Sequence, residues 1–321
     1  MKFFGIHLLI TLMVGLMQPT VLEPAQTPEL TFEEYKEYFG DLVREEDVET
    51  ALAQIEVELD KSPIVFEYCH ALVHEIGRAA YARYGFEEAL LFEADICGSG
   101  YLHGMVEAYL AEQSDVLSAL KTVCDPDDGV CMHGVGHGLM MYTNNDIPAA
   151  LAYCDEFENH STQIHCSEGV FMENFGLDWN LHAHPYLKVE DPMYPCNEQD
   201  GKYKNTCYFY APRLYNRVHE NAYEQAIEWC LTAEAGYEQD CMRGQGSTMM
   251  KYSMDDISGI EAVCEGAPGE YAALCIRGMT SYYIVNYASA ERGKELCVLL
   301  NMGNKLACME EVEAKGAFYQ D

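Results

Sequence analysis

The sequence predicts an all-α fold, an α-α superhelix (solenoid) of about seven helical hairpins with one disulfide per repeat. Three observations lead to this prediction: cysteines recur at a fixed interval, each interval holds two amphipathic segments, and no segment alternates apolar and polar residues over a useful length. The interval of about 34 residues is the length of one helix–turn–helix unit. Such units bury their apolar faces by stacking on their neighbours.

The fourteen cysteines include two interleaved series that keep step along the chain. The first series has steps of 33 to 35 residues and one step of 41; it consists of Cys97, Cys131, Cys166, Cys207, Cys241, Cys275 and Cys308. The second has steps of 33 or 34 residues and consists of Cys196, Cys230, Cys264 and Cys297. Because the series run in parallel, we expect neighbours to pair, as Cys124–Cys131, Cys154–Cys166, Cys196–Cys207, Cys230–Cys241, Cys264–Cys275 and Cys297–Cys308. Antiparallel packing of the first hairpin adds Cys69–Cys97.

Each repeat has the same layout. A first segment, here named helix A, runs from a cysteine to an aromatic residue, as in "CMHGVGHGLMMY" at 131–142. A second amphipathic segment, helix B, ends in a cysteine, as in "IPAALAYC" at 147–154. Helix A carries a glycine three residues after its cysteine, at Gly100, Gly134, Gly169, Gly244 and Gly278. This glycine allows close approach of a neighbouring helix or of a ligand, and close helix packing is the commoner reason.

In period and layout, residues 65 to 315 resemble the tetratricopeptide and Sel1-like superfamily of helical arrays, whose secreted Sel1-like members also carry cysteines at fixed places in each repeat. The resemblance implies a stacked helical architecture. The "A-x-x-L-G" and tryptophan signatures are missing, so it implies no particular function.

The N-terminus predicts export. Residues 1–25 contain one lysine, an apolar run from Phe3 to Met17 and then the small residue Ala25, which is the layout of a secretory signal peptide. The alternative is a retained membrane anchor, for which the run is near the lower length limit. Residues 28–62 predict two capping helices, and residues 63–321 the disulfide-stapled repeat domain. We expect a secreted or extracytoplasmic monomer without a membrane span in the mature chain.

The charge balance is strongly acidic, since 19 Lys and Arg face 53 Asp and Glu, for a formal net charge of −34. Such a surface repels nucleic acid and anionic membranes, so we expect no nucleic-acid partner.

The first three A helices predict a metal site. Residues four apart lie on one face of a helix, and this spacing aims two imidazoles at one ion. Five histidines follow this register: His70, His74, His103, His133 and His137. With the thiols in disulfides, nitrogen and oxygen donors suit zinc, copper(II) or iron. We expect His103 and His137 to reach a common ion, while His70 and His74 join it only if the array curves tightly and otherwise form a second site.

Other readings of these helices stay open. The imidazoles and nearby carboxylates could form a hydrogen-bonded network that rigidifies the array, or a switch that titrates near the histidine pKa. The methionines Met105, Met140, Met141 and Met172 would favour copper as ligands, but methionine more often fills the core.

The same register in later repeats gives a basic end, which predicts a clamp for an anionic group by Arg213, Arg243, Lys251 and Arg277. Near the histidines, Glu107 and Glu75 are the candidate catalytic bases or ligands. The repeat lengthens at about 177–195, where His182 and His184 lie in a loop that is either a lid over the groove or a plain surface insertion.

The leading hypothesis is therefore a secreted metal-binding helical-repeat protein, acting as a metal-dependent enzyme on a small anionic molecule or peptide. The alternatives are a non-catalytic solenoid that binds a peptide or acidic ligand, and a structural envelope protein. Bound metal with an open coordination position would separate the first from the others.

Overall fold

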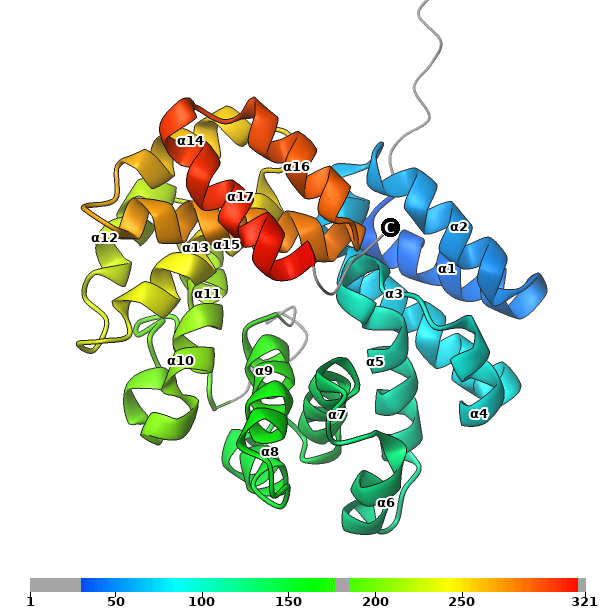
Figure 1. Ribbon diagram of the computed structural model, residues 1–321. Helices are drawn as coiled ribbons and strands as arrows, with labels where there is room; N and C mark the ends of the chain where they lie inside the picture. Colours follow the sequence, from blue (N-terminus) through cyan, green and yellow to red (C-terminus); the bar gives the residue numbers. More distant parts are fainter. Residues whose placement is uncertain (1–29, 177–184, 317–321) are drawn as a thin grey trace, which may run out of the picture. The chain divides into compact units, whose positions relative to one another are not determined.

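The computed structural model describes residues 30–176 and 185–316. Every regular element in these ranges is helical, which confirms the all-α prediction (Figure 1). Two helices precede the first repeat, α1 (Phe32–Glu45) and α2 (Val48–Leu59). The predicted signal peptide lies outside the described residues.

The A segments form the longer helices of the repeats. They are α3 (Pro63–Tyr84), α5 (Ile96–Ala111), α7 (Gly129–Tyr142), α9 (His160–Gly176), α10 (Gly201–Tyr210) with α11 (Pro212–Val218), α13 (Glu238–Tyr252), α15 (Tyr271–Tyr287) and α17 (Met302–Gly316). The B segments are shorter: α4 (Phe86–Ala89) with the 3-10 turn η1 (Leu90–Phe92), α6 (Val116–Val123), α8 (Ile147–Cys154), the 3-10 turn η2 (Cys196–Glu198), α12 (Tyr223–Cys230), α14 (Ile257–Glu265) and α16 (Ala290–Leu299).

Two A segments depart from the continuous helix that the sequence predicts. In the fifth repeat, Pro212 divides the segment into α10 and α11, because proline has no N–H to donate to the preceding turn. In the second repeat, Cys97, Gly98 and Ser99 have positive φ values of 56°, 66° and 57°, so the regular helix begins after a left-handed turn.

All seven disulfides join the cysteines that the repeat predicts, with Cα–Cα distances of 5.3 to 5.7 Å. No free cysteine remains in the described part of the chain. Disulfides persist in oxidising compartments, so this pattern indicates an extracytoplasmic environment. No helix among the described residues combines the length and the apolar character needed to cross a bilayer.

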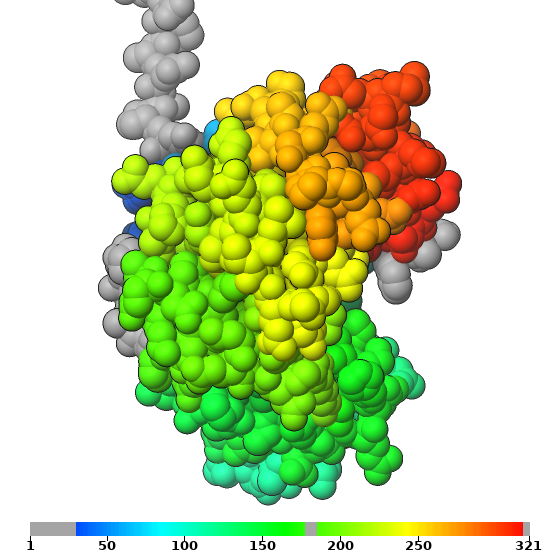
Figure 2. Space-filling view, turned by 90° about the vertical axis from the view of Figure 1, so that its left-hand side faces the viewer, coloured from blue at the N-terminus to red at the C-terminus, as the bar shows by residue number. Residues whose placement is uncertain are grey.

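Consecutive A helices pack against one another through glycine. A Cβ at Gly136 in α7 would overlap the carbonyl oxygen of Cys166 in α9, and one at Gly169 would overlap that of His133. Gly77 and Gly104 make the same reciprocal contact between α3 and α5. Glycines therefore bring neighbouring backbones into direct contact. In the predicted register, Gly169, Gly244 and Gly278 do so, whereas Gly77, Gly104 and Gly136 lie outside that register. In the space-filling view, the surface passes in sequence order from green through yellow to orange (Figure 2).

The succession of A helices closes on itself within residues 31–316. Helix α15 packs on α3 and α5, and α13 also contacts α3 (Figure 1). The ring of Phe66 in α3 meets those of Tyr282, Tyr283 and Tyr287 in α15. The Asn286 side chain donates a hydrogen bond to the Phe66 carbonyl at 3.4 Å. The first and last repeats consequently share one hydrophobic core.

We expect Gly136→Ala to lower the free energy of unfolding by roughly 1–3 kcal/mol, because the added methyl group meets the α9 backbone, which cannot move aside as a side chain could. Urea denaturation measures the change. Gly303→Ala in α17 is the matched control, since a Cβ there meets nothing within 4 Å; it should leave stability unchanged or raise it by up to ~1 kcal/mol. Equal effects of the two substitutions would contradict the packing role.

Candidate metal centre

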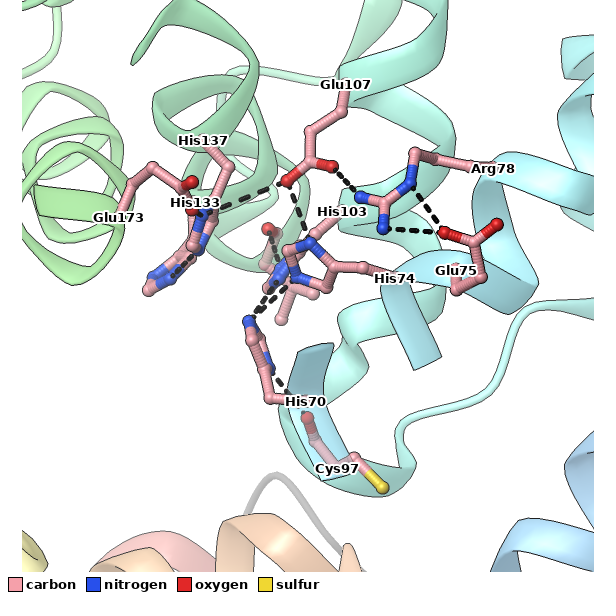
Figure 3. A network of polar contacts seen from close by, with 11 residues as sticks. His70, His74, Glu75, Arg78, Cys97, His103, Glu107, His133, His137 and Glu173 are labelled. Atoms are coloured by element: carbon pink, nitrogen blue, oxygen red, sulfur yellow. Dashed lines mark hydrogen bonds and ion pairs between the residues drawn. The ribbon is translucent and has the colours of Figure 1, made fainter. Parts of the chain in front are cut away.

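Three consecutive A helices bring their histidines into one cluster. His70 and His74 come from α3, His103 from α5, and His133 and His137 from α7 (Figure 3). Neighbouring imidazole centroids lie between 4.5 and 6.4 Å apart. The array therefore curves enough for both helix α3 histidines to join those of α5 and α7.

Each of four rings has one nitrogen anchored on its outer side. His70 Nδ1 lies 2.7 Å from the Cys97 carbonyl oxygen, and His103 Nε2 lies 3.1 Å from that of Val130. His74 Nδ1 lies 2.8 Å from Glu107 Oε1. His137 Nδ1 lies 2.7 Å from the Glu173 carboxyl group (Figure 3). These contacts hold the rings in fixed orientations.

The other nitrogens of these rings point toward one another. His70 Nε2 lies 2.9 Å from His74 Nε2 and 3.4 Å from His103 Nδ1. One ligand atom from each of His70, His74, His103 and His137 falls within a group whose members all lie within 4.8 Å of one another. A tetrahedral ion with Zn–N bonds of about 2.0–2.1 Å needs nitrogens roughly 3.3–3.4 Å apart. The spacing can therefore close around an ion with small side-chain movements.

The anchors decide which nitrogens carry protons. A carbonyl oxygen only accepts hydrogen bonds, so His70 Nδ1 and His103 Nε2 must donate. Burial lowers the pKa of both imidazoles well below the usual value, and the neighbouring imidazoles lower it further. Both rings are then neutral at pH 7, and their inward nitrogens carry lone pairs. Two lone pairs facing each other at 3.4 Å repel, and a cation between them removes the repulsion.

The anchoring carboxylates form a second layer around the cluster. Glu107 is 2% exposed and accepts hydrogen bonds from His74 and, at 2.6 Å, from Arg78. Although burial alone would raise it, these two partners lower the pKa of Glu107. Arg78 also pairs with Glu75 at 3.0 Å. Glu75 thus holds the arginine that neutralises Glu107, and the catalytic role of both glutamates stays a prediction.

Glu173 differs from Glu107 in its ionisation. Burial, helped by the Glu107 charge and opposed by Arg78, raises the pKa of Glu173 to about 8. With Glu107 and His137 it forms a second group of three donors within 4.8 Å. The Glu173 carboxyl can therefore hold a proton near neutral pH beside the His137 ring.

His133 lies at the accessible edge of the cluster. Its Nε2 is 3.1 Å from His137 Nε2, and its side chain is 15% exposed. Glu168, 3.9 Å from His133 Nδ1 and 36% exposed, stands beside it. A ligand could reach the cluster from this side.

Three of these partners were not singled out from the sequence. Glu173 lies seven residues after Cys166, whereas His133 and His137 lie two and six residues after Cys131, so Glu173 does not share the helix face that picks out the histidines. An acidic residue inside the apolar run "GVFMENF" was the available signal. The Cys97 and Val130 carbonyls carry no sequence signal, because they depend on backbone conformation.

The predicted clamp arginines and the nearby methionines have other partners in the structure. Arg243 pairs with Glu311 at 3.0 Å and Arg277 pairs with Glu310. These internal carboxylates weigh against a four-membered clamp. Met105 and Met140 are fully buried in the hydrophobic core, as core-filling methionines are. His182 and His184 lie outside the described residues.

No family model, curated protein or solved structure matches this chain.

We expect Arg78→Met to lower the free energy of unfolding by roughly 2–4 kcal/mol, because Glu107 stays buried without its guanidinium partner. The range is below that for a fully buried pair, since Arg78 is 31% exposed. Chemical denaturation measures it. Arg277→Met, which breaks a more exposed pair, should cost only about 0–1 kcal/mol.

Adding Glu107→Gln to Arg78→Met should restore part of the lost stability, because the unpaired charge is removed. If the double variant is no more stable than Arg78→Met alone, the ion pair does not control stability here.

Proposed function

We propose that this chain is an extracytoplasmic metalloprotein that holds a divalent transition-metal ion between the imidazoles of its first three repeats. The observation that carries the proposal is the orientation of the rings: outer nitrogens anchored on carbonyl or carboxyl oxygens, inner nitrogens converging. Metal-bound histidines in proteins have this arrangement, because the outer hydrogen bond fixes the tautomer and raises ligand basicity.

The types of donor atom limit which metal ion the site can bind. Four imidazole nitrogens without thiolate suit zinc, copper(II) or iron. The described cysteines are all in disulfides, and Met105 and Met140 are buried in the hydrophobic core, so neither group supplies a soft ligand for copper(I). A shell of four imidazole nitrogens fits tetrahedral zinc most simply.

Catalysis on an anionic substrate is the more specific form of this proposal. A metal ion polarises a substrate oxygen or activates water. Glu173, with its raised pKa, is suited to proton transfer beside the cluster, and the exposed edge at His133 and Glu168 offers an approach. A non-catalytic ligand-binding protein would have the same ion but no turnover.

The architecture supports a wider assignment. Stacked A helices at a period near 34 residues support a place among tetratricopeptide and Sel1-like arrays. Seven disulfides and the predicted leader at residues 1–25 support secretion.

We expect the chain, purified without an affinity histidine tag and dialysed with zinc, copper(II) or iron(II), to retain one equivalent of ion by mass spectrometry. His103→Ala and His137→Ala should fold but lose the ion, since each removes one converging nitrogen. His219→Ala is the matched control: His219 is exposed, contacts Tyr215 and lies outside the cluster.

Retention of the ion by both cluster variants would contradict the site. If the parent chain binds none of the three ions and the His103→Ala variant is less stable than the parent, the cluster is a hydrogen-bonded imidazole network instead.

A further inference from the structure

Arg213 is the one arginine or lysine that is buried among the described residues, with 6% of its surface exposed. Its guanidinium lies 4.8 Å from the Tyr210 ring centroid, and no described carboxylate lies within ion-pair distance of it. A buried charge without a counter-ion is costly, and cation–π contact compensates only part of that cost. The Arg213 side chain therefore lacks the counter-ion that would offset the cost of burying its charge.

Lys251 is a second cation without an ion-pair partner among the described residues, although its side chain is only partly buried. Its Nζ contacts the Glu67 carbonyl oxygen and lies 5.1 Å and 5.4 Å from the ring centroids of Tyr68 and Tyr252. No described carboxylate pairs with this ammonium group. Burial, together with the charges of Arg213 and Arg217 and against that of Glu67, lowers the pKa of Lys251 to about 7. The charged forms of Lys251 and Arg213 thus destabilise each other.

The helices that carry the two cations are linked by packing to helix α3 of the histidine cluster. Helix α11, which carries Arg213, packs on α13, which carries Lys251, and α13 contacts α3, which carries His70. Helix α15 reaches the same place, because a Cβ at Gly98 would lie 3.0 Å from Val285 and 3.4 Å from His70 Nδ1. Closure of the array therefore sets α13 beside the helix that supplies His70.

The contrast with the other predicted clamp residues is informative. Arg243 and Arg277 each stand two residues after a helix A cysteine and each pairs with a glutamate of α17, whereas Arg213 stands six residues after its cysteine and has no such pair. In a chain with 53 acidic residues, carboxylate partners are plentiful. Arg213 and Lys251 repel each other and have no described carboxylate as an ion-pair partner. This indicates that an anion from outside the chain neutralises them.

We propose that Arg213 and Lys251 bind an oxyanion group, a carboxylate, phosphate or sulfate, of a small ligand. The arginine fork matches such a group with two parallel hydrogen bonds, and the lysine adds a point charge. Where the ion of the proposed function is present, the ligand lies beside it, so this anion is the substrate class for that site. The anion site itself needs no metal.

The test uses the full mature chain after removal of ions with a chelator, titrated calorimetrically with sulfate, inorganic phosphate and acetate. We expect at least one of these probes to bind, and its identity separates phosphate-like from carboxylate-like ligands. Arg213→Gln should weaken binding by about tenfold or more, since charge-assisted hydrogen bonds are lost. Arg213→Lys, which keeps the charge but not the fork, should fall between Arg213→Gln and the parent.

Lys251→Met is the second variant, in case Arg213 is needed for folding, and should also weaken binding. Arg277→Gln is the matched control and should bind as the parent does, because Glu310 already neutralises Arg277. Thermal melting verifies that each variant is folded.

The proposal is overturned if no probe binds the parent in the millimolar range, or if folded Arg213→Gln and Lys251→Met bind as tightly as the parent. Ion retention by the same variants is measured separately. Loss of anion binding with the ion retained supports this site alone, whereas failure of the parent to retain any ion contradicts the metal proposal and leaves the anion result unaffected.

Discussion

The backbone contact between consecutive A helices, made through glycine, is the constraint on which the rest of the structure depends. At Gly136 and Gly169 the two backbones meet so closely that no Cβ fits between them. Ordinary helices pack 8–10 Å apart, and larger residues at the contact increase that distance. Close approach lets imidazoles from three helices share one small volume. It also packs each repeat closely against the next. In the same array, α15 packs on α3 and α5.

The same closeness removes water from the histidines, and this determines their chemistry. Burial favours the neutral imidazole at His70, His103 and His137, so each of these rings offers one lone pair and one N–H. The N–H of His70 or His103 is taken by a backbone carbonyl, and that of His74 by Glu107. The lone pairs of the inner ring nitrogens therefore point toward one another. A rigid, dehydrated set of converging donors is what a transition-metal site requires.

The charged side chains near the histidine cluster differ from those on the surface. The chain is acidic overall, and several of its cations pair with carboxylates of its own surface. Arg78 instead neutralises the buried Glu107 that orients His74. Arg213 and Lys251 lie deeper, against aromatic rings rather than acids. These two cations are thus without an ion-pair partner among the described residues of a strongly acidic protein.

The sequence by itself determined the all-α class, the repeat period, all seven disulfide pairs and the histidines of the cluster, because each depends on spacing along one helix or between neighbouring helices. Only the tertiary structure decided that His70 and His74 join His103 and His137, since that depends on how tightly the array curves. It also decided that Arg243 and Arg277 bind α17 glutamates while Arg213 does not. The break at Pro212 and the left-handed turn at Cys97 are local, but their effects on Arg213 and on the His70 anchor appear only when distant helices pack. Such contacts follow from helix packing in three dimensions, which periodicity in one sequence does not encode.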